Sequence, residues 1–313
     1  MTIEAVRRRT VAWADPACAP VSALIGLRRV SAGEGRARMA MVPAEYHYNP
    51  LGSVHGGIVA TLAEAAMACA VGATLPPGRV ATTVEIKVNY LRALTLAAGE
   101  AVCDGAVVHA GRRTAVTEAR ITDAAGRLYA VASGTYLLSD APPAGPAPEA
   151  GEWQVAWSDP TEAVREGAAA AGLDYMSALA TGRLPPPPAI ELLGITLAAV
   201  EAGHVTMTLP PGAHLHDASA SVHPGMIAIL LDSVMGCSVH STLPAGQGYT
   251  TLEIKVTFLQ PVTAATGPLI GAGQVVHAGG QMAIAEGQAR DAAGRLYATA
   301  STTCLVFSRL ARA

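Results

Sequence analysis

The chain has 313 residues, about twice the length of a usual single domain, so we expect two domains. Hydrophobic residues make up 51% of it and charged residues 14%, with a formal net charge of −3 at pH 7. No long basic stripe is present, which argues against a nucleic-acid partner. The uncharged run 256–285 contains two prolines and cannot form a helix that crosses a membrane. We expect no membrane association and a cytoplasmic protein, because no apolar leader follows the arginines at 7–9.

The cysteines and histidines show neither a disulfide framework nor a metal site. The five cysteines are an odd number without a C-x-x-C pair, and they lie mostly in apolar segments, as reduced and buried thiols do. The nine histidines lack the spacing to one another and to cysteine that a metal site requires. We therefore expect no metal and no cofactor.

The first half of the chain predicts one long helix among antiparallel strands. A short strand is expected near 36–42. The segment 56–75 is apolar on nearly every face and ends at a Pro-Pro-Gly sequence, which predicts a helix surrounded by protein. Apolar and polar residues alternate over 84–90, and two further strands, 113–122 and 127–138, are joined by a turn that contains glycine. This pattern indicates an α+β domain in which a sheet wraps one helix.

The second half of the chain repeats the first half without a gap. At an offset of 168 residues, 24–138 matches 192–306, so the chain holds two copies of one domain. A shorter echo pairs 11–16 with 155–160 at an offset of 144. The second copy therefore carries 24 extra residues.

Composition places the boundary between the copies near residue 140. The segment 141–152 is rich in proline and alanine, which is typical of an exposed, semi-extended linker. We expect the first domain over 1–140 and the second over 153–313. The extra residues include Thr161–Ala180, which precedes Gly182 and a run of four prolines. This predicts one additional N-terminal helix that packs across the second domain.

Each long helix contains one carboxylate, Glu64 in the first copy and Asp232 in the second, nine residues after a histidine. A buried carboxylate is costly, so it serves either a structural hydrogen bond or chemistry that uses a raised pKa or a desolvated nucleophile. His55, Gly56 and Gly57 begin the first helix, where unpaired N–H groups favour negative charge and can stabilise a carbonyl oxygen.

These residues together resemble a known family. The sequence Asn49-Pro-Leu-Gly-Ser-Val-His55-Gly56-Gly57, an acid nine residues after the histidine, and the strand Thr83–Leu91 are similar to hotdog-fold acyl-CoA thioesterases of the phenylacetate-degradation type. The resemblance covers both copies, about 115 residues each. It implies a tandem (double) hotdog fold, in which the copies form an intramolecular pseudo-dimer with their sheets joined edge to edge and active sites between them. A further homodimer is left open.

For one site, the resemblance implies hydrolysis of an acyl-CoA thioester to free acid and CoA by groups from both copies. The Gly56 N–H would polarise the carbonyl, and Asp232 would attack it or activate water, two roles that the sequence leaves open. It also leaves open whether Thr251 or Thr250 supplies the hydroxyl beside the carboxylate. Asn49 is either an ordinary turn residue or a ligand of the substrate. The catalytic residues implied are Asn49, His55, Gly56, Asp232 and Thr251.

The second site departs from the family pattern. It would combine Glu64 and Thr83 with Asp217 and His223, and Pro224 stands where the first copy has glycine. Proline has no N–H, and the loss of one oxyanion donor costs on the order of 100- to 1000-fold in rate. We expect one working site and a second that is degenerate or serves only for binding, although Glu64 keeps activity there open.

The substrate is expected to be a short- or medium-chain or aryl acyl-CoA, because the chain has few aromatic and many small aliphatic residues. Gly57 and the turn residues Arg112 and Arg113 are candidate substrate-binding groups, the arginines as ligands of the CoA phosphates unless they are merely solvated. Two other functions stay open. One is a non-catalytic acyl-CoA-binding or regulatory module, and the other is a hotdog enoyl hydratase or dehydratase, whose motif matches poorly around His47 and His55.

Overall fold

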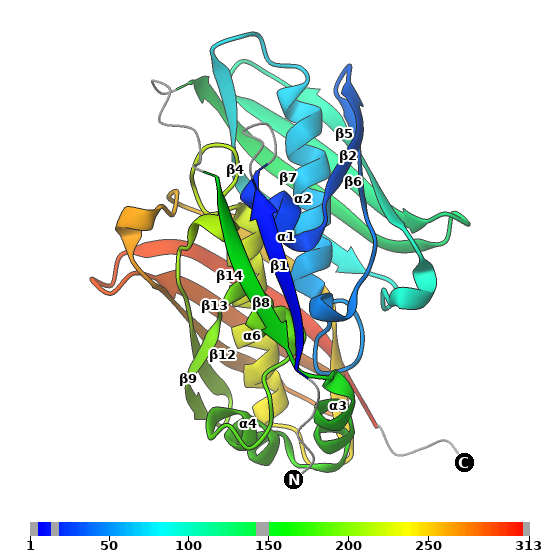
Figure 1. Ribbon diagram of the computed structural model, residues 1–313, viewed down its shortest axis with the longest axis vertical. Coiled ribbons are helices and arrows are strands. Elements are labelled where there is room, and N and C mark those ends of the chain that lie inside the picture. The colour runs from blue at the N-terminus through cyan, green and yellow to red at the C-terminus, as the bar shows by residue number, and fades with distance from the viewer. Residues whose placement is uncertain (1–5, 14–18, 142–149, 309–313) are drawn as a thin grey trace.

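The computed structural model describes residues 6–13, 19–141 and 150–308 (Figure 1). Two similar units each place one long helix against a curved antiparallel sheet, and the two sheets join edge to edge. This confirms the predicted α+β class and the tandem hotdog arrangement. Most of the expected linker, 142–149, lies outside the described residues.

The elements follow the same order in both units, except for two helices that only the second unit has. The first unit contains β1 (Arg7–Trp13), α1 (Pro20–Ile25), β2 (Arg28–Gly33), β3 (Arg36–Met41), the 3-10 turn η1 (Glu45–His47), α2 (Gly56–Gly72), β4 (Arg79–Tyr90), η2 (Leu96–Ala98), β5 (Ala101–Ala110), β6 (Thr114–Asp123) and β7 (Leu128–Asp140). The second contains β8 (Gly151–Trp157), α3 (Pro160–Ala169), α4 (Gly172–Ala180), α5 (Pro188–Leu193), β9 (Thr196–Glu201), β10 (His204–Leu209), η3 (Ala213–Leu215), α6 (Pro224–Ser241), β11 (Gln247–Phe258), η4 (Ala264–Thr266), β12 (Leu269–Ala278), β13 (Met282–Arg290) and β14 (Leu296–Ser308).

Within the described residues, twelve strands form one continuous sheet in the order β2-β3-β5-β6-β7-β4-β11-β14-β13-β12-β10-β9. The two units therefore join where β4 pairs with β11 in an antiparallel ladder. In that ladder Lys87 stands opposite Lys255, its counterpart in the repeat. The pseudo-two-fold axis that relates the units thus passes between β4 and β11.

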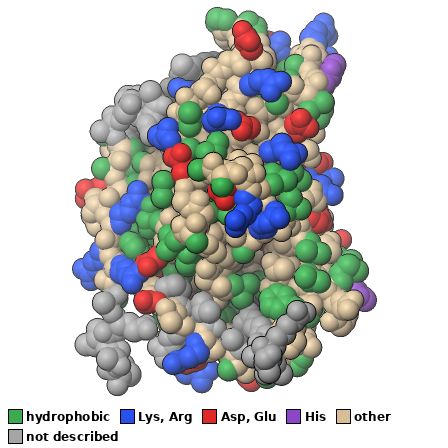
Figure 2. Space-filling view, turned by 90° about the vertical axis from the view of Figure 1, so that its right-hand side faces the viewer, with side chains coloured by type: hydrophobic (Ala, Val, Ile, Leu, Met, Phe, Trp, Pro, Cys, Tyr) green, Lys and Arg blue, Asp and Glu red, His purple; other side chains and the backbone are tan. Residues whose placement is uncertain are grey.

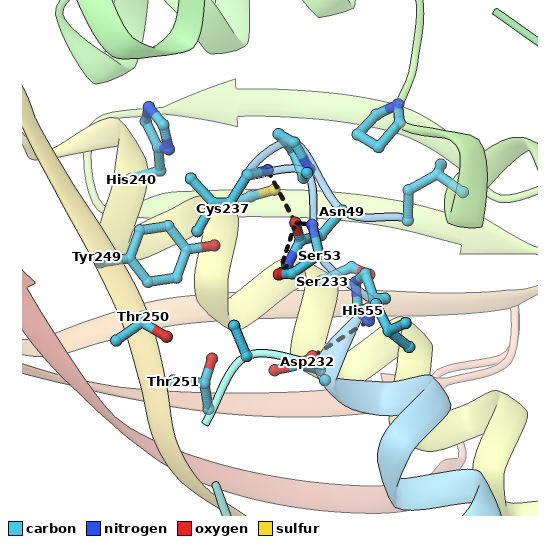
Figure 3. A pocket seen from close by; sticks show the side chains of 18 of the residues that line it. Asn49, Ser53, His55, Asp232, Ser233, Cys237, His240, Tyr249, Thr250 and Thr251 are labelled. Atoms are coloured by element: carbon cyan, nitrogen blue, oxygen red, sulfur yellow. Dashed lines mark hydrogen bonds and ion pairs between the residues drawn. The ribbon is translucent and has the colours of Figure 1, made fainter. Parts of the chain in front are cut away.

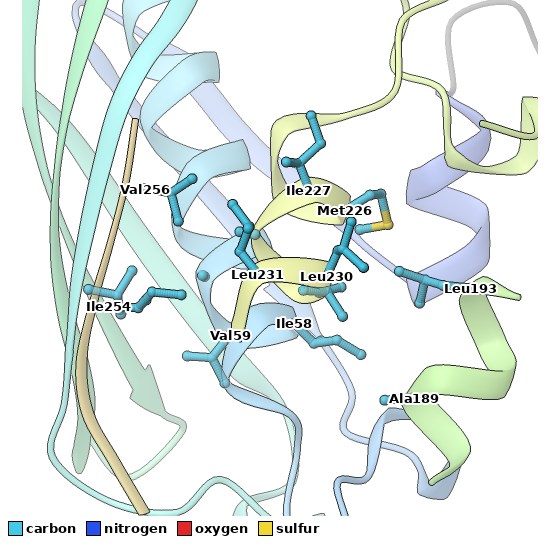
Figure 4. Close-up of a cluster of buried hydrophobic side chains, with 14 of the residues drawn as sticks. Ile58, Val59, Ala189, Leu193, Met226, Ile227, Leu230, Leu231, Ile254 and Val256 are labelled. Carbon is cyan, nitrogen blue, oxygen red and sulfur yellow. The ribbon is translucent and has the colours of Figure 1, made fainter. Parts of the chain in front are cut away.

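The long helices α2 and α6 contact each other at the centre of the molecule. Both are apolar on all faces, as the sequence predicted, because each is enclosed by its own sheet and by the other helix. Helix α6 has the length and composition of a membrane span, but 89% of it is buried inside the protein, as in a core helix. Ile58 and Val59 of α2 pack beside Leu230 and Leu231 of α6 (Figure 4).

The prediction of one helix over Thr161–Ala180 needs correction, because the structure has two helices there, α3 and α4. The backbone is extended at the two residues between them, Ala170 and Ala171. The Gly172 N–H donates to the Leu243 carbonyl at 2.9 Å and not to a carbonyl of α3, so the helix is interrupted here. Glycine is needed at 172 because a Cβ would clash with the His240 carbonyl oxygen. Helix α4 contacts α6 and β9, so this part of the insertion does pack on the second unit.

The short echo in the sequence corresponds to two strands that pair across the units. β1 and β8 form a separate antiparallel ribbon, with Arg7 opposite Trp157, that crosses the junction in front of the helices (Figure 1). Elsewhere on the surface, acidic and basic side chains are interspersed on the face in Figure 2 rather than gathered into one patch. Exposed pairs such as Arg38 with Asp104, 2.6 Å apart, contribute to this mixture.

Candidate active site

One cavity of about 760 Å³ lies between the two units, beside the start of α2 and the middle of α6. The first unit lines it with the loop before α2 and the segment after β4, and the second lines it with α4, α5, α6, β11 and β14. Its polar walls bring together the side chains labelled in Figure 3. They are Asn49, Ser53, His55, Asp232, Ser233, Cys237, His240, Tyr249, Thr250 and Thr251.

Asp232 is a buried carboxylate that points from α6 toward the start of α2. Its Oδ2 accepts a hydrogen bond from the Gly57 N–H at 3.0 Å and lies 3.3 Å from His55 Nδ1. Burial raises the pKa of Asp232, while His55, the Gly57 N–H and the Thr251 hydroxyl oppose this rise. The carboxylate is thus desolvated but held by donors from both units. Of the two threonines that the sequence left open, Thr251 is the one whose hydroxyl lowers the pKa of Asp232.

His55 caps α2 and is fixed as a neutral ring. Its Nδ1 accepts from the Gly57 N–H at 3.1 Å, and its Nε2 lies 3.1 Å from Ser233 Oγ. The Ser233 hydroxyl donates to the Ile229 carbonyl at 2.6 Å, so Ser233 accepts the Nε2–H of the ring. Burial lowers the pKa of His55 and so favours the same neutral form, although the attraction of Asp232 opposes this shift. His55 therefore positions the helix start, and Asp232 is the group of this pair that can carry charge near pH 7.

Gly56 places a backbone donor next to that carboxylate. It occupies the first position of α2, and its N–H makes no hydrogen bond with the described part of the chain. A Cβ on Gly56 would lie 2.8 Å from Asp232 Oδ2, so only glycine permits this approach. The Tyr90 hydroxyl donates to the Gly56 carbonyl at 2.8 Å and fixes the peptide. A carbonyl oxygen bound at this N–H would thus lie beside Asp232.

Asn49 shapes the loop that leads into α2. Its Oδ1 accepts from the Leu51 N–H at 2.8 Å and the Ser53 N–H at 3.3 Å, and its Nδ2 donates to Ser53 Oγ at 3.1 Å. Asp217 does the same in the second unit, where it accepts from the Ser219 N–H at 2.8 Å. Both residues are therefore turn-forming groups, although Asn49 also faces the cavity.

The repeat-related second cluster is built differently. Thr83 donates to Glu64 Oε1 at 2.7 Å, and Glu64 Oε2 lies 3.1 Å from His223 Nε2, with the ring N–H poorly directed along this line. The longer glutamate reaches this ring nitrogen because Ala65 stands where the first cluster has Ser233. Glu64 is only 1% exposed and does not line the cavity. Pro224 begins α6, so the first position of this helix has no N–H, and the Gly225 N–H that follows donates to His223 Nδ1 at 3.0 Å.

Three expected substrate-binding groups lie outside the cavity wall. Gly57 is buried, and its N–H is occupied by His55 and Asp232. Arg112 and Arg113 are exposed in the turn after β5, where their carbonyls accept from Arg79 and from the Leu138 N–H. The structure therefore does not bring these arginines to the cavity. Within the described residues, no group of three or more His, Cys, Asp or Glu side chains is placed to hold a metal ion.

Sequence reasoning missed Ser233, Tyr90 and the cavity wall formed by α4. A signal was present for the first two, because the repeat replaces Ser233 by Ala65 and Tyr90 by Phe258. The hydroxyl groups of Ser233 and Tyr90 have no counterpart in the repeat, and both lie in the Asp232 cluster, which lines the cavity. For α4, the signal was its absence from the first copy.

Comparison with known proteins places this geometry in a family. The sequence model of the thioesterase superfamily matches residues 51–130 and 220–298, about half of the chain. The 1,4-dihydroxy-2-naphthoyl-CoA hydrolase of Listeria monocytogenes is 30% identical over 114 residues, which are 36% of this chain and 91% of that protein.

Two solved structures are similar over nearly the whole chain. The tesB protein of Mycobacterium avium subs paratuberculosis has a TM-score of 0.60 at 14% identity and covers 92% of this chain and 98% of its own. A hot dog fold protein from Alicyclobacillus acidocaldarius has a TM-score of 0.55 at 15% identity and covers 87% of this chain and 93% of its own. These two likenesses support the tandem hotdog fold. With the family match over both repeats, the chain belongs to the thioesterase superfamily and is a thioester hydrolase.

Proposed function

We propose that this chain is an acyl-CoA thioesterase with one working site, in the cavity between the two units. The observation that carries the proposal is the close approach of the Asp232 carboxylate to Gly56, the first residue of α2, in the wall of that cavity. Hydrolysis of a thioester needs a group that delivers water or attacks the carbonyl, and a donor that stabilises the oxygen as it gains charge. Asp232 and Gly56 supply these two functions.

The reaction follows from the placement of these groups. The thioester carbonyl oxygen accepts a hydrogen bond from the Gly56 N–H, which lies at the positive end of the α2 dipole. Asp232 either removes a proton from water as the water oxygen bonds to the carbonyl carbon, or bonds to that carbon itself and is later released by water. In both routes the carbon–sulfur bond breaks and the CoA thiolate takes up a proton. The hydrogen bond from the Gly57 N–H and the nearby Thr251 hydroxyl keep the carboxylate aimed at the carbonyl.

The acyl group would lie against the wall that α4 and α5 contribute. This wall is largely apolar, with Met176 and Leu179 from α4 and Ile190 from α5, and Leu197 of β9 continues it. Aliphatic and sulfur side chains favour a short- or medium-chain acyl group or a small aryl group over a charged one. The first unit has no counterpart of α4, so this wall serves the Asp232 site.

The Glu64 cluster is proposed to be structural. Glu64 is held by Thr83 and lies close to His223, is sealed from solvent, and lies near a helix start whose first residue, Pro224, has no N–H. A carboxylate in such a place lacks the oxyanion donor that Gly56 offers to Asp232.

The test is thiol release from a panel of short-chain, medium-chain and aryl acyl-CoAs by wild type, Asp232→Asn and the matched variant Glu64→Gln. We expect Asp232→Asn to lower kcat by about 10²- to 10⁴-fold, because the reacting group is lost. Glu64→Gln should keep kcat within about threefold if it folds, which circular dichroism checks. Activity lost in Glu64→Gln but kept in Asp232→Asn would reverse the site assignment. The absence of thiol release from every acyl-CoA by wild type would contradict the proposed activity.

A further inference from the structure

A second groove continues the cavity at its outer end. Its volume is about 420 Å³, and it shares Arg92, Ala93 and Thr95 with the larger cavity. The segment after β4, the turn η2 and the β6–β7 turn form its walls. A ligand whose reactive end lies at Asp232 can thus extend into this groove without leaving the protein surface.

Arg92 brings a positive charge to this groove that the fold itself does not need. Its Nη1 donates to the Leu128 carbonyl at 2.7 Å. In the second unit, the equivalent Gln260 donates from Nε2 to the equivalent Leu296 carbonyl at 2.8 Å. A neutral amide therefore makes the same structural hydrogen bond. What arginine adds is its charge and four further N–H donors, on the side of the molecule that has the open cavity.

Arg127 supplies a second cation to the groove. It is exposed in the β6–β7 turn, and its side chain lies near the Asp123 carboxylate. Asp123 is already committed to its own turn, since Oδ1 accepts from the Ala125 and Arg127 N–H groups and Oδ2 accepts from the Tyr129 hydroxyl. The second unit repeats this turn with Arg295 but has no partner arginine at Gln260. Of the two positions, the second unit keeps only the arginine of the turn, so the pair Arg92 and Arg127 belongs to the groove beside the Asp232 site.

We propose that Arg92 and Arg127 bind the phosphate groups of the nucleotide end of coenzyme A while its thioester lies at Asp232. The inference rests on the proposed function, and it places the CoA phosphates at this groove instead of at Arg112 and Arg113. Guanidinium groups bind phosphate oxygens through paired, charge-assisted hydrogen bonds. The flexible pantetheine arm would pass through the shared wall of the two cavities.

The first test is calorimetric binding of free CoA to wild type, Arg92→Gln and the matched control Arg295→Gln. Glutamine keeps the hydrogen bond to Leu128, as Gln260 shows, and removes only the charge and the other donors. We expect Arg92→Gln to weaken CoA binding by roughly 5- to 20-fold, since a charged hydrogen bond near the surface is lost. Arg295→Gln should bind as wild type does. Equal affinity of Arg92→Gln and wild type for CoA would overturn the proposal.

The second test compares acyl-CoA with the acyl-pantetheine thioester of the same acid, which lacks the nucleotide. In Arg92→Gln we expect KM to rise by a similar factor for acyl-CoA, with kcat unchanged, while KM for acyl-pantetheine stays at the wild-type value. A rise in KM for both substrates would overturn the proposal, because the arginine would then act on the cavity itself. If wild type binds CoA more tightly than Arg92→Gln but hydrolyses neither thioester, the proposed activity fails and the phosphate site stands.

Discussion

At the scale of single residues, Gly57 shows how closely the two central helices approach. A Cβ there would lie 2.5 Å from the Ile229 Cα and 2.9 Å from its nitrogen, both backbone atoms that cannot turn away. We expect Gly57→Ala to lower the free energy of unfolding by about 1–3 kcal/mol or more, because α2 and α6 must move apart. Thiol release should also fall, since the Gly57 N–H holds Asp232. Urea unfolding and the thiol assay measure the two effects.

The matched control is Gly72→Ala, at the other end of the same helix. A Cβ at Gly72 meets nothing within 4 Å, so alanine should leave stability unchanged or raise it by up to about 1 kcal/mol through its helix propensity. A similar loss in Gly72→Ala would contradict the contact with Ile229 as the cause, because a Cβ at Gly72 meets no atom within 4 Å.

The sequence predicted the residues of the Asp232 cluster to the extent that a repeat and a helix start can reveal them. His55 and Asp232 have counterparts in the repeat, His223 and Glu64, and the structure brings His55, Gly56 and Asp232 together. Ser233 and Tyr90 are single hydroxyls in apolar segments, and their partners depend on how the two units pack. That packing could not be read from local pattern, which is why these two were missed.

At the scale of elements, α4 decides what the cavity can hold. It exists only in the second unit, and Met176, Leu179 and Ala180 face the cavity from it. We expect Leu179→Trp to fill the acyl wall and to raise KM at least about tenfold for the longer acyl-CoAs in a chain-length series, with little change for the shortest. The reason is steric, since a filled apolar pocket rejects added methylenes at roughly 1–3 kcal/mol each.

The control for α4 is Leu173→Trp on the same helix. Leu173 is 38% exposed and does not line the cavity, so the same new side chain should leave the chain-length profile unchanged. A profile that shifts equally in both variants would show that α4 acts through the stability of the fold rather than as the acyl wall.

The long elements followed from sequence pattern, whereas the short ones did not. The central helices were predicted because an apolar run of their length is stable only when it is buried in a core. The predicted end of α2 was too late, since the helix ends at Gly72 and not at 75. The break at 170–171 was missed, since alanine favours helix and the bond of the Gly172 N–H to the Leu243 carbonyl depends on how the chain packs. The ribbon of β1 and β8 was visible only as an echo, because its pairing joins strands 144 residues apart.

At the scale of the whole molecule, the junction of the units brings two lysines together, and a glutamate near each lysine offsets their repulsion. Lys87 faces Lys255 across the β4–β11 ladder, but Lys87 Nζ lies 3.7 Å from Glu253 and Lys255 Nζ lies 3.0 Å from Glu85. These pairs are partly exposed, so each contributes at most about 1 kcal/mol. The backbone ladder and the contact of α2 with α6 must therefore hold the units together.

Buried histidines make this union sensitive to acid. His47 lies in η1, which contacts α5 of the other unit. His214 lies in η3, which contacts α1 of the other unit, and its ring stacks on that of Trp153 with the ring centroids 3.7 Å apart. Burial lowers the pKa of His47 to about 3, with Arg9 adding to the effect, and that of His214 to about 4, with His216 adding. Both rings are therefore neutral in the folded protein near pH 7, in the segments through which the units contact each other.

Stability should consequently fall as the pH drops below about 6.5, where the unfolded chain binds protons that the folded rings refuse. The expected loss is about 1.4 kcal/mol per pH unit for each histidine, continuing down to the folded pKa values near 4 and 3. Urea unfolding at pH 7.0, 6.0 and 5.0, values at which most carboxylates stay ionised, measures the slope. His214→Phe keeps a ring against Trp153 without a titrating nitrogen, so its slope should be shallower by about one histidine's share. A wild-type stability that does not change over this range, or a variant with the full wild-type slope, would contradict the assignment of acid sensitivity to these rings.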